Sequence, residues 1–221
     1  MVGNIISLIK KEFILEWRQR YAINGIILYL ASTVFICYMS FGLKGGIITP
    51  ITWNALFWII ILFTAVNAVA KSFLQESLGR SLYYFSLVKP EGFIISKIIY
   101  YAGLLLTMSI LGFVFYAFVM GNPVQDKPMY LLVLLLGSIG LSSTLTLTSA
   151  IASKASNSSS LMAVLSFPII IPLLLVLIKA SKNAMDGLDR SIYTDQLLTL
   201  GAIITLIMGL SYLLFPYLWR S

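Results

Sequence analysis

Six long runs of apolar residues constrain this chain more than any other feature of its sequence. A helix needs about 20 such residues to cross the roughly 30 Å of hydrocarbon in a bilayer. In lipid, backbone groups must bond within their own segment, and the chain has no alternating strand pattern. The runs therefore predict an all-α integral membrane protein. Its six transmembrane helices are expected at Tyr21–Leu43, Trp53–Ala70, Ile98–Val119, Met129–Ile151, Ser160–Ile178 and Gln196–Leu218.

The composition agrees with this class of protein. Charged residues make up 10% of the chain and hydrophobic residues 59%, whereas a soluble domain has about 25% charged residues. The 15 basic and 8 acidic residues all lie outside the six predicted spans. We interpret residues 1–221 as a single transmembrane permease domain. We attribute the net charge of +7 to basic cytoplasmic loops and expect no binding of nucleic acid.

The distribution of lysine and arginine predicts the orientation in the membrane, because cytoplasmic loops carry an excess of these residues. With the N-terminus inside, the cytoplasmic segments hold ten of the 15, namely Lys10, Lys11, Arg18, Arg20, Lys71, Arg80, Lys89, Lys97, Lys154 and Arg220. The other side holds the remaining five, namely Lys44, Lys127, Lys179, Lys182 and Arg190. Both termini are therefore expected in the cytoplasm.

The first 20 residues are charged and carry no cleavable signal pattern. Val2, Ile5, Ile6, Ile9, Phe13 and Trp17 share one helical face. This pattern indicates an N-terminal interfacial helix that leads into the first span. The alternative is a plain charged segment ahead of the membrane anchor.

The segment Lys71–Lys97 is the longest polar interruption of the chain. From Phe73 to Val88 its apolar residues fall on one half of a helical wheel, which predicts an amphipathic helix on the cytoplasmic side. Lys89–Gly92 should end this helix, because Pro90 disfavours the α conformation at the residue before it. Such a helix either docks into a partner's groove or is an ordinary helix of an interfacial loop.

Two spans carry packing signals. In the fourth span, small residues repeat every four positions, which lets another helix approach closely; these residues are Ser138, Ser142, Thr146 and Ala150. In the fifth span, Pro168 and Pro172 each remove a backbone hydrogen bond and favour a kink.

Asn54 and Asn67 in the second span are interpreted as hydrogen-bond partners between helices. A substrate path is the alternative for the small residues and for both asparagines.

Several kinds of chemistry lack the residues that they need. The chain contains no histidine and a single cysteine, Cys37, so we expect no metal site and no haem held by histidine. Neither histidine nor a lysine inside a span is present to activate a serine. No GxxxxGK[ST] phosphate-binding loop occurs either. We therefore expect no catalytic residues and no cofactor bound by this chain alone.

The chain resembles the CcmB family, the permease subunits of the haem exporter in bacterial cytochrome c maturation. More widely, it resembles the six-helix permeases of ABC exporters. The resemblance covers nearly the whole chain and rests on three segments. These are KKEFILEWRQRYAINGIILY before and in the first span, FTAVNAVAKSFLQESLGRSLYYFSLVKPEGFIISKIIYY, and SFPIIIPLLL in the fifth span.

The resemblance implies that the helix Phe73–Val88 is the coupling helix that docks on a separate ATPase subunit. Glu76 and Gly79 match the family's acidic and glycine positions, and Pro90 and Lys97 match the proline and lysine that open the third span. The full set of residues expected to couple to the ATPase is Phe73, Leu74, Glu76, Leu78, Gly79, Arg80, Leu82, Pro90 and Lys97.

The resemblance further implies a permease in the bacterial inner membrane that couples a partner's ATP hydrolysis to release of a haem-loaded chaperone. ATP would bind the partner subunit, and haem would be handled by the complex. The partners would be a CcmA-type ATPase and membrane proteins of the CcmC, CcmD and CcmE types. The alternatives are an ABC permease for a lipid, glycan or drug, a scaffold that transports nothing, and a membrane enzyme.

The predicted orientation can be tested by labelling single cysteines. With Cys37 replaced by Ser, a cysteine at Gln125 should react with an impermeant thiol reagent applied outside, and a cysteine at Ser156 should not. The ten basic residues on the inner side, against five on the outer side, give this expectation, since basic loops resist translocation. The reverse labelling pattern would overturn the orientation.

Overall fold

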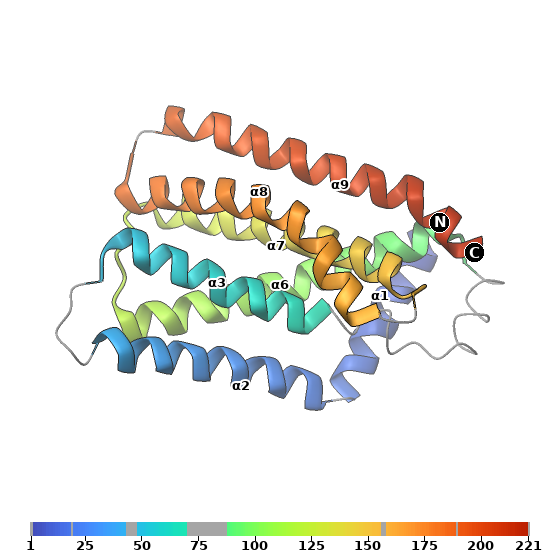
Figure 1. The fold of residues 1–221 in the computed structure, drawn as a ribbon, viewed down its shortest axis with the longest axis horizontal. Helices are drawn as coiled ribbons and strands as arrows, with labels where there is room; N and C mark the ends of the chain where they lie inside the picture. Colours follow the sequence, from blue (N-terminus) through green and yellow to red (C-terminus); the bar gives the residue numbers. More distant parts are fainter. Residues whose placement is uncertain are drawn as a thin grey trace.

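The computed structural model describes residues 2–18, 20–42, 48–69, 88–155, 158–188 and 190–220, which form a bundle of long helices (Figure 1). Its elements are α1 (Val2–Arg18), α2 (Arg20–Cys37), the π-helix η1 (Tyr38–Gly42), α3 (Pro50–Val69), α6 (Pro90–Met120), α7 (Lys127–Ala152), α8 (Ser158–Asp186), the 3₁₀ helix η2 (Arg190–Tyr193) and α9 (Thr194–Arg220). Six of the described helices are long and apolar enough to cross a membrane. The predicted fold class is therefore confirmed.

Helix α7 forms the centre of the bundle. Every residue from Leu141 to Ala150 is buried, so this part of α7 is covered on all sides. Its neighbours are α6, α8, α9 and α3. Two glycines allow close approach. A methyl group built on Gly137 would lie 2.7 Å from the indole of Trp58, and one on Gly140 would lie 3.0 Å from Leu173.

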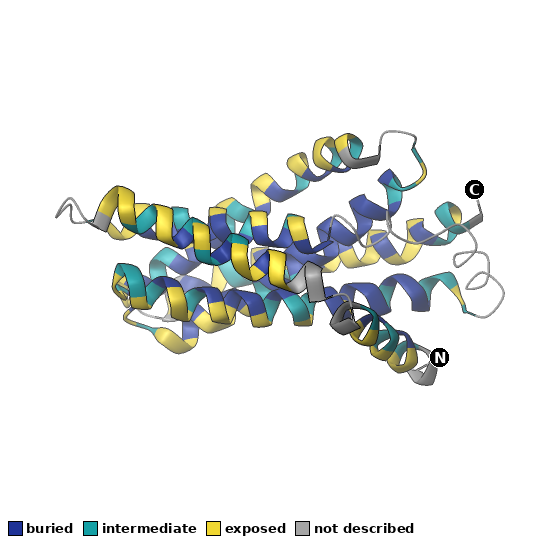
Figure 2. Cartoon of the chain, turned by 90° about the horizontal axis from the view of Figure 1, so that it is seen from below, coloured by how far each residue is buried: buried dark blue, intermediate teal, exposed yellow. Residues whose placement is uncertain are grey.

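The outer helices bury only one stripe each. In α2 the stripe consists of Ile26, Leu30 and Val34, spaced four residues apart. Residues at this spacing share one face of a helix. The opposite faces of the outer helices carry exposed apolar side chains, which Figure 2 shows in yellow along the length of the bundle. In a membrane protein such faces are those that contact lipid.

Helix α1 crosses one end of the bundle obliquely (Figures 1 and 2). It buries Leu8 against α6, whereas Ile6 and Phe13 remain exposed. Ile6 and Phe13 of the predicted apolar face therefore point outward, as an interfacial helix requires, whereas Ile9 of the same face packs against the main hydrophobic core. The side that packs on the bundle also includes Leu8 and Glu12.

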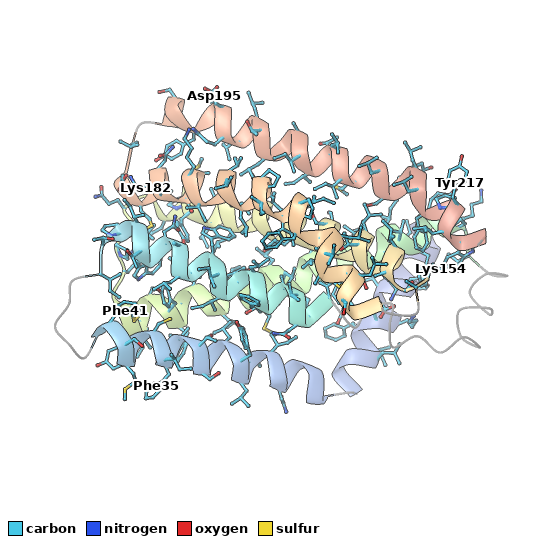
Figure 3. All side chains as sticks on the ribbon, viewed as in Figure 1. Phe35, Phe41, Lys154, Lys182, Asp195 and Tyr217 are labelled. Atoms are coloured by element: carbon cyan, nitrogen blue, oxygen red, sulfur yellow. The ribbon has the colours of Figure 1, made fainter. Side chains whose placement is uncertain are left out.

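The described bundle has two distinct ends, and charged residues gather at both. The end that holds α1, the start of α6 and the last turns of α9 is named the terminal end, because both chain termini lie there (Figure 1). Lys154 and Tyr217 lie at this end (Figure 3). Lys182 and Asp195 lie at the other, named the opposite end (Figure 3).

Two helices extend well beyond the predicted spans. Helix α6 begins at Pro90 rather than at Ile98, and its 31 residues reach roughly 46 Å at 1.5 Å per residue. Helix α8 continues past Ile178 to Asp186, where Lys182 and Asp186 form an ion pair of 2.7 Å. Hydropathy marks the stretch that fits hydrocarbon, whereas the helices themselves continue into the interface.

The close approach at Gly137 predicts a specific cost. Gly137→Ala should lower the thermal stability of the protein in mild detergent, because its methyl group would clash with Trp58 and overpacking costs about 1–3 kcal/mol. Gly209→Ala is the matched control, since nothing lies within 4 Å of a methyl group built there. Equal melting temperatures for the two variants would show that α3 and α7 do not meet this closely.

Candidate functional site: the joint at the start of helix α6

Helix α6 starts where the predicted amphipathic segment ends. Lys89 is extended, with φ −66° and ψ 137°, as expected for a residue that precedes proline. Pro90 then occupies the first helical turn, where its missing N–H costs nothing. Glu91 lies in the same turn, where a carboxylate favours the positive end of the helix dipole. The sequence thus fixes an abrupt change of direction at this point.

About two turns further on, Lys97 is buried and ion-paired. Its side chain is 1% exposed, and its Nζ atom lies 3.4 Å from Oε1 of Glu12 in α1. Glu12 also meets its neighbour Lys11 at 2.9 Å. Lys97 lies in the membrane-length helix α6, one residue before the predicted third span, which begins at Ile98. Its charge is tolerated because a carboxylate from another helix lies beside it.

A cluster of aromatic rings begins beside this ion pair. Phe93, one turn before Lys97, has its ring 5.3 Å from the Lys97 ammonium and 5.9 Å from that of Lys11. On its other side it meets two rings of α9, Phe215 at 6.1 Å and Trp219 at 5.0 Å. Cations at this distance from a ring are attracted by its π electrons. We name Glu12, Lys97, Phe93, Phe215 and Trp219 the α1–α6–α9 joint.

The electrostatics of the joint favour an ionised Glu12. Burial alone would raise the pKa of this carboxyl, but the positive charges of Lys97 and Lys11 outweigh burial and hold the pKa below its usual 4.5. Glu12 is therefore a carboxylate at neutral pH. A buried pair of this kind fixes geometry strictly, since removing one partner leaves an uncompensated charge.

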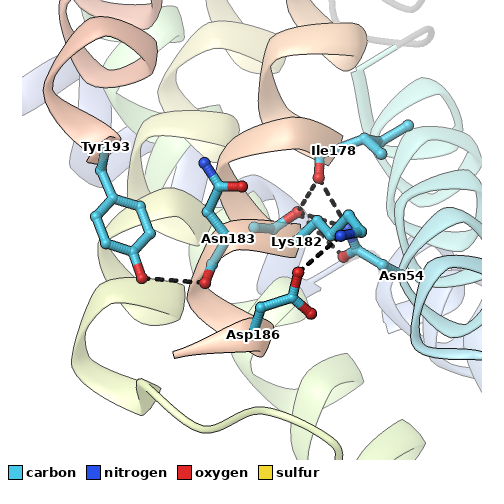
Figure 4. Close-up of polar contacts among 7 residues, drawn as sticks. Asn54, Ile178, Lys182, Asn183, Asp186 and Tyr193 are labelled. Atoms are coloured by element: carbon cyan, nitrogen blue, oxygen red, sulfur yellow. Dashed lines mark hydrogen bonds and ion pairs between the residues drawn. The ribbon is translucent and has the colours of Figure 1, made fainter. Parts of the chain in front are cut away.

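A second polar cluster connects three helices toward the opposite end (Figure 4). Asn54 of α3 donates from Nδ2 to the carbonyl of Ile178 and to Oγ of Ser181, both at 2.9 Å. Trp58 donates from Nε1 to the same Ser181 oxygen at 2.8 Å. Tyr130 of α7 donates to Oδ1 of Asn54 at 3.3 Å. The interpretation of Asn54 as a partner between helices is thus confirmed, whereas Asn67 is exposed.

The Asn54 cluster is neutral and closed. Asn54 and Ser181 are both 0% exposed, and Trp58 is 1% exposed. Their polar atoms satisfy one another, so the cluster is suited to fixing α3, α7 and α8 rather than to holding a ligand. Among the described residues, no group of three or more histidine, cysteine or acidic side chains gathers as a metal site would require.

Only part of the predicted coupling set can be located in the structure. Pro90 opens α6, and Lys97 lies inside the joint. Lys97 is too deeply buried to touch a partner directly, so any influence on coupling would pass through its neighbours, which include Glu12 and Phe93. The other predicted residues lie outside the described part of the chain; these are Phe73, Leu74, Glu76, Leu78, Gly79, Arg80 and Leu82.

The predicted packing residues all lie in membrane-length helices. The small residues of α7 are buried, with Ser138 and Ala150 at 2% exposure and Ser142 and Thr146 at 0%. They therefore meet other helices and not lipid. Both prolines lie inside α8, which bends along its course in Figure 1.

Sequence reasoning missed four members of the joint. Phe93 precedes Lys97 by four residues, and Phe215 precedes Trp219 by four. Each pair thus lies on one helical face, beside the boundary of a predicted span. Glu12 also stands out in the sequence, because it is one of only 8 acidic residues. No local pattern, however, connects Glu12 with Lys97.

The described bundle of six membrane-length helices, with α1 across one end, defines a multispanning α-helical membrane protein. The family model described as CcmB protein matches residues 3–215. The chain therefore belongs to the CcmB family, as the sequence resemblance indicated. No curated protein matches the chain.

Membership of this family implies a defined role. CcmB proteins are permease subunits of an ABC complex that serves haem export in cytochrome c maturation. The chain is accordingly a membrane subunit and not itself an enzyme, and its complex includes an ATPase partner. Family and fold together place it as a multi-pass protein of the inner membrane.

The lowered pKa of Glu12 predicts how stability depends on pH. A carboxylate whose pKa is lower in the folded than in the unfolded protein stabilises the fold fully above the unfolded value of 4.5. This stabilisation is lost as the pH falls through the lowered pKa. Glu12→Gln should therefore cost about 3 kcal/mol at neutral pH. The gap in thermal stability between variant and wild type should shrink below pH 4.5.

Thermal unfolding in mild detergent across this pH range measures the gap. Asp186→Asn is the control, because its pair with Lys182 is exposed and such pairs contribute only about 0–1 kcal/mol. A Glu12→Gln gap that stays constant or widens in acid would contradict the assignment.

Proposed function

We propose that this chain transmits ATP hydrolysis by a CcmA-type ATPase to release of a haem-loaded chaperone of the CcmE type. Membrane proteins of the CcmC and CcmD types complete the proposed complex. The observation that carries the proposal is the CcmB match over residues 3–215. In the proposed complex, ATP binds the partner ATPase and haem is handled by the complex as a whole. This chain alone binds no cofactor.

The segment that precedes α6 is the proposed contact with the ATPase. In the predicted helix from Phe73 to Val88, apolar side chains cover half of the helical wheel. This apolar face is larger than a solvated loop needs. Val88, the last residue of this segment, packs against the second hydrophobic cluster of the protein, which includes Phe93 and Leu8. A contact at the segment would thus be continuous with the α1–α6–α9 joint.

We further propose that the terminal end faces the cytoplasm. Both termini lie at this end (Figure 1), as does Lys154 (Figure 3). Under this orientation the predicted coupling segment also faces the cytoplasm, where an ATPase can reach it. The excess of basic residues in the same segments supports the assignment.

The proposal is tested by purifying the tagged chain from membranes in mild detergent. The wild-type protein should bring down an ATPase and haem-handling membrane proteins. Glu76→Lys should keep expression normal but lose most of the ATPase, because a reversed charge at an interface costs several kcal/mol. Within the helix alone, the Glu76–Arg80 spacing is worth only about 0.2–0.5 kcal/mol, so a solvated loop would tolerate the change.

Two further variants sharpen the test. Gly79→Leu should also lose the ATPase, if the partner's surface approaches the backbone at this glycine. Lys127→Glu, at the opposite end of the bundle, should retain it. Full ATPase recovery and full cytochrome c maturation with both Glu76→Lys and Gly79→Leu would reduce the segment to a surface loop. Recovery of lipid- or glycan-synthesis proteins instead of haem-handling partners would point to a different substrate.

A further inference from the structure

Helix α6 is attached differently at its two ends. At the terminal end it meets α1, where Lys97 pairs with Glu12 at 3.4 Å. A methyl group built on Gly92 would lie 3.9 Å from Cγ1 of Ile5 and 4.0 Å from Cγ1 of Val88. The start of α6 is therefore held between α1 and the last residue of the predicted coupling segment.

At the opposite end α6 is fixed to α3. Trp53 donates from Nε1 to the carbonyl of Gly121 at 3.1 Å, just after the last turn of α6. Tyr116 donates to the carbonyl of Trp53 at 3.3 Å, and the two rings lie 4.6 Å apart. Helix α3 is itself bound to α8 through Asn54. This end of α6 therefore belongs to a closed, hydrogen-bonded block.

We propose that the Glu12–Lys97 pair passes movement of the segment before α6 on to the N-terminal helix α1. Lys97 is then a positioning residue that acts through Glu12. The inference rests on the proposed function, because an ATPase must move that segment. With its far end fixed to α3, α6 responds to a push at Pro90 by tilting. The buried pair obliges α1 to follow, since separating its charges would take the buried ammonium of Lys97 away from the carboxylate of Glu12, while Glu12 would keep its contact with Lys11.

The aromatic part of the joint extends the same movement to α9. Phe93 contacts the ammonium of Lys97 as well as the rings of Phe215 and Trp219. A tilt of α6 would displace Phe93 against both rings. Helices α1, α6 and α9 would thus move as one unit at the terminal end. The opposite end of α6, which is hydrogen-bonded to α3, would remain in place.

Cross-linking measures the contact between α1 and α6 independently of haem. In a Cys37→Ser background, Ile5→Cys and Gly92→Cys should form a disulfide readily on mild oxidation, because the two positions are in contact. Adding Lys97→Met or Glu12→Gln should lower the cross-linking yield several-fold. Adding Lys182→Met, which breaks the exposed pair of α8, should leave the yield unchanged.

Coupling is measured in the complex purified with its ATPase. Lys97→Met and Glu12→Gln, without the added cysteines, should lower cytochrome c maturation several-fold per amount of assembled complex. ATP hydrolysis by the same complex should stay near the wild-type rate, because the ATPase remains bound but no longer drives α1. A purely structural role for the pair would lower both activities in step with the amount of complex.

The charge swap Glu12→Lys with Lys97→Glu decides the case even if the single variants assemble poorly. The swap keeps one acidic and two basic groups at the joint, counting Lys11. It should restore both the cross-linking yield and maturation. No restoration, unchanged cross-linking in the single variants, or ATP hydrolysis that falls together with maturation would each overturn the proposal. If the wild-type chain brings down no ATPase, the proposed function fails, while the cross-linking still tests the pair.

Discussion

The bundle depends on how the polar groups of α7 are satisfied, because every residue of this helix from Leu141 to Ala150 is buried. Hydroxyl groups in lipid or in a protein core need partners. Most of those in α7 donate to a carbonyl of the preceding turn, as Ser138 does to Leu134 at 2.8 Å and Thr144 to Gly140 at 2.8 Å. These bonds need no neighbouring helix. Helix α7 can therefore carry many small polar side chains against its neighbours.

Small side chains are what the surrounding helices need. Between helices in a membrane, association relies on close packing, because lipid tails are as apolar as the side chains they would replace. The ring of Trp58 and the side chain of Leu173 reach α7 only because Gly137 and Gly140 leave room for them. Thr146 and Ser149 are buried in the described structure without a hydrogen-bond partner. At those two positions the small volume of the side chain matters for helix packing, and the hydroxyl group makes no hydrogen bond.

Much of this architecture could be predicted from the sequence, since hydropathy and helical spacing are local properties. Six membrane-length helices, the helix ahead of them, and the role of Asn54 follow from single segments. The length of α6 does not, because its first turns are polar and leave the hydrocarbon. The burial of Lys97 also escaped prediction. Its partner Glu12 lies in a helix far away in the sequence, and only the fold brings the two together.

The two ends of the bundle join their helices with different chemistry. The Asn54 cluster includes only neutral groups, which can satisfy one another where water is absent. The Glu12–Lys97 pair requires two charges, whose transfer to hydrocarbon would be far more costly. Lys97 lies in the first turns of α6, beside a helix of interfacial character, where that cost is smaller.

This difference also determines which end can respond to a partner. A neutral, closed network offers an approaching protein no net charge to engage, and it holds α3, α7 and α8 together. An ion pair remains sensitive to nearby charge, as the effect of Lys97 and Lys11 on the pKa of Glu12 illustrates. The helices that meet at the pair, α1 and α6, pack together with Val88, which lies two residues before Pro90. The charged end of the bundle is therefore suited to receive a signal, and the neutral end to provide the fixed support against which α6 can tilt.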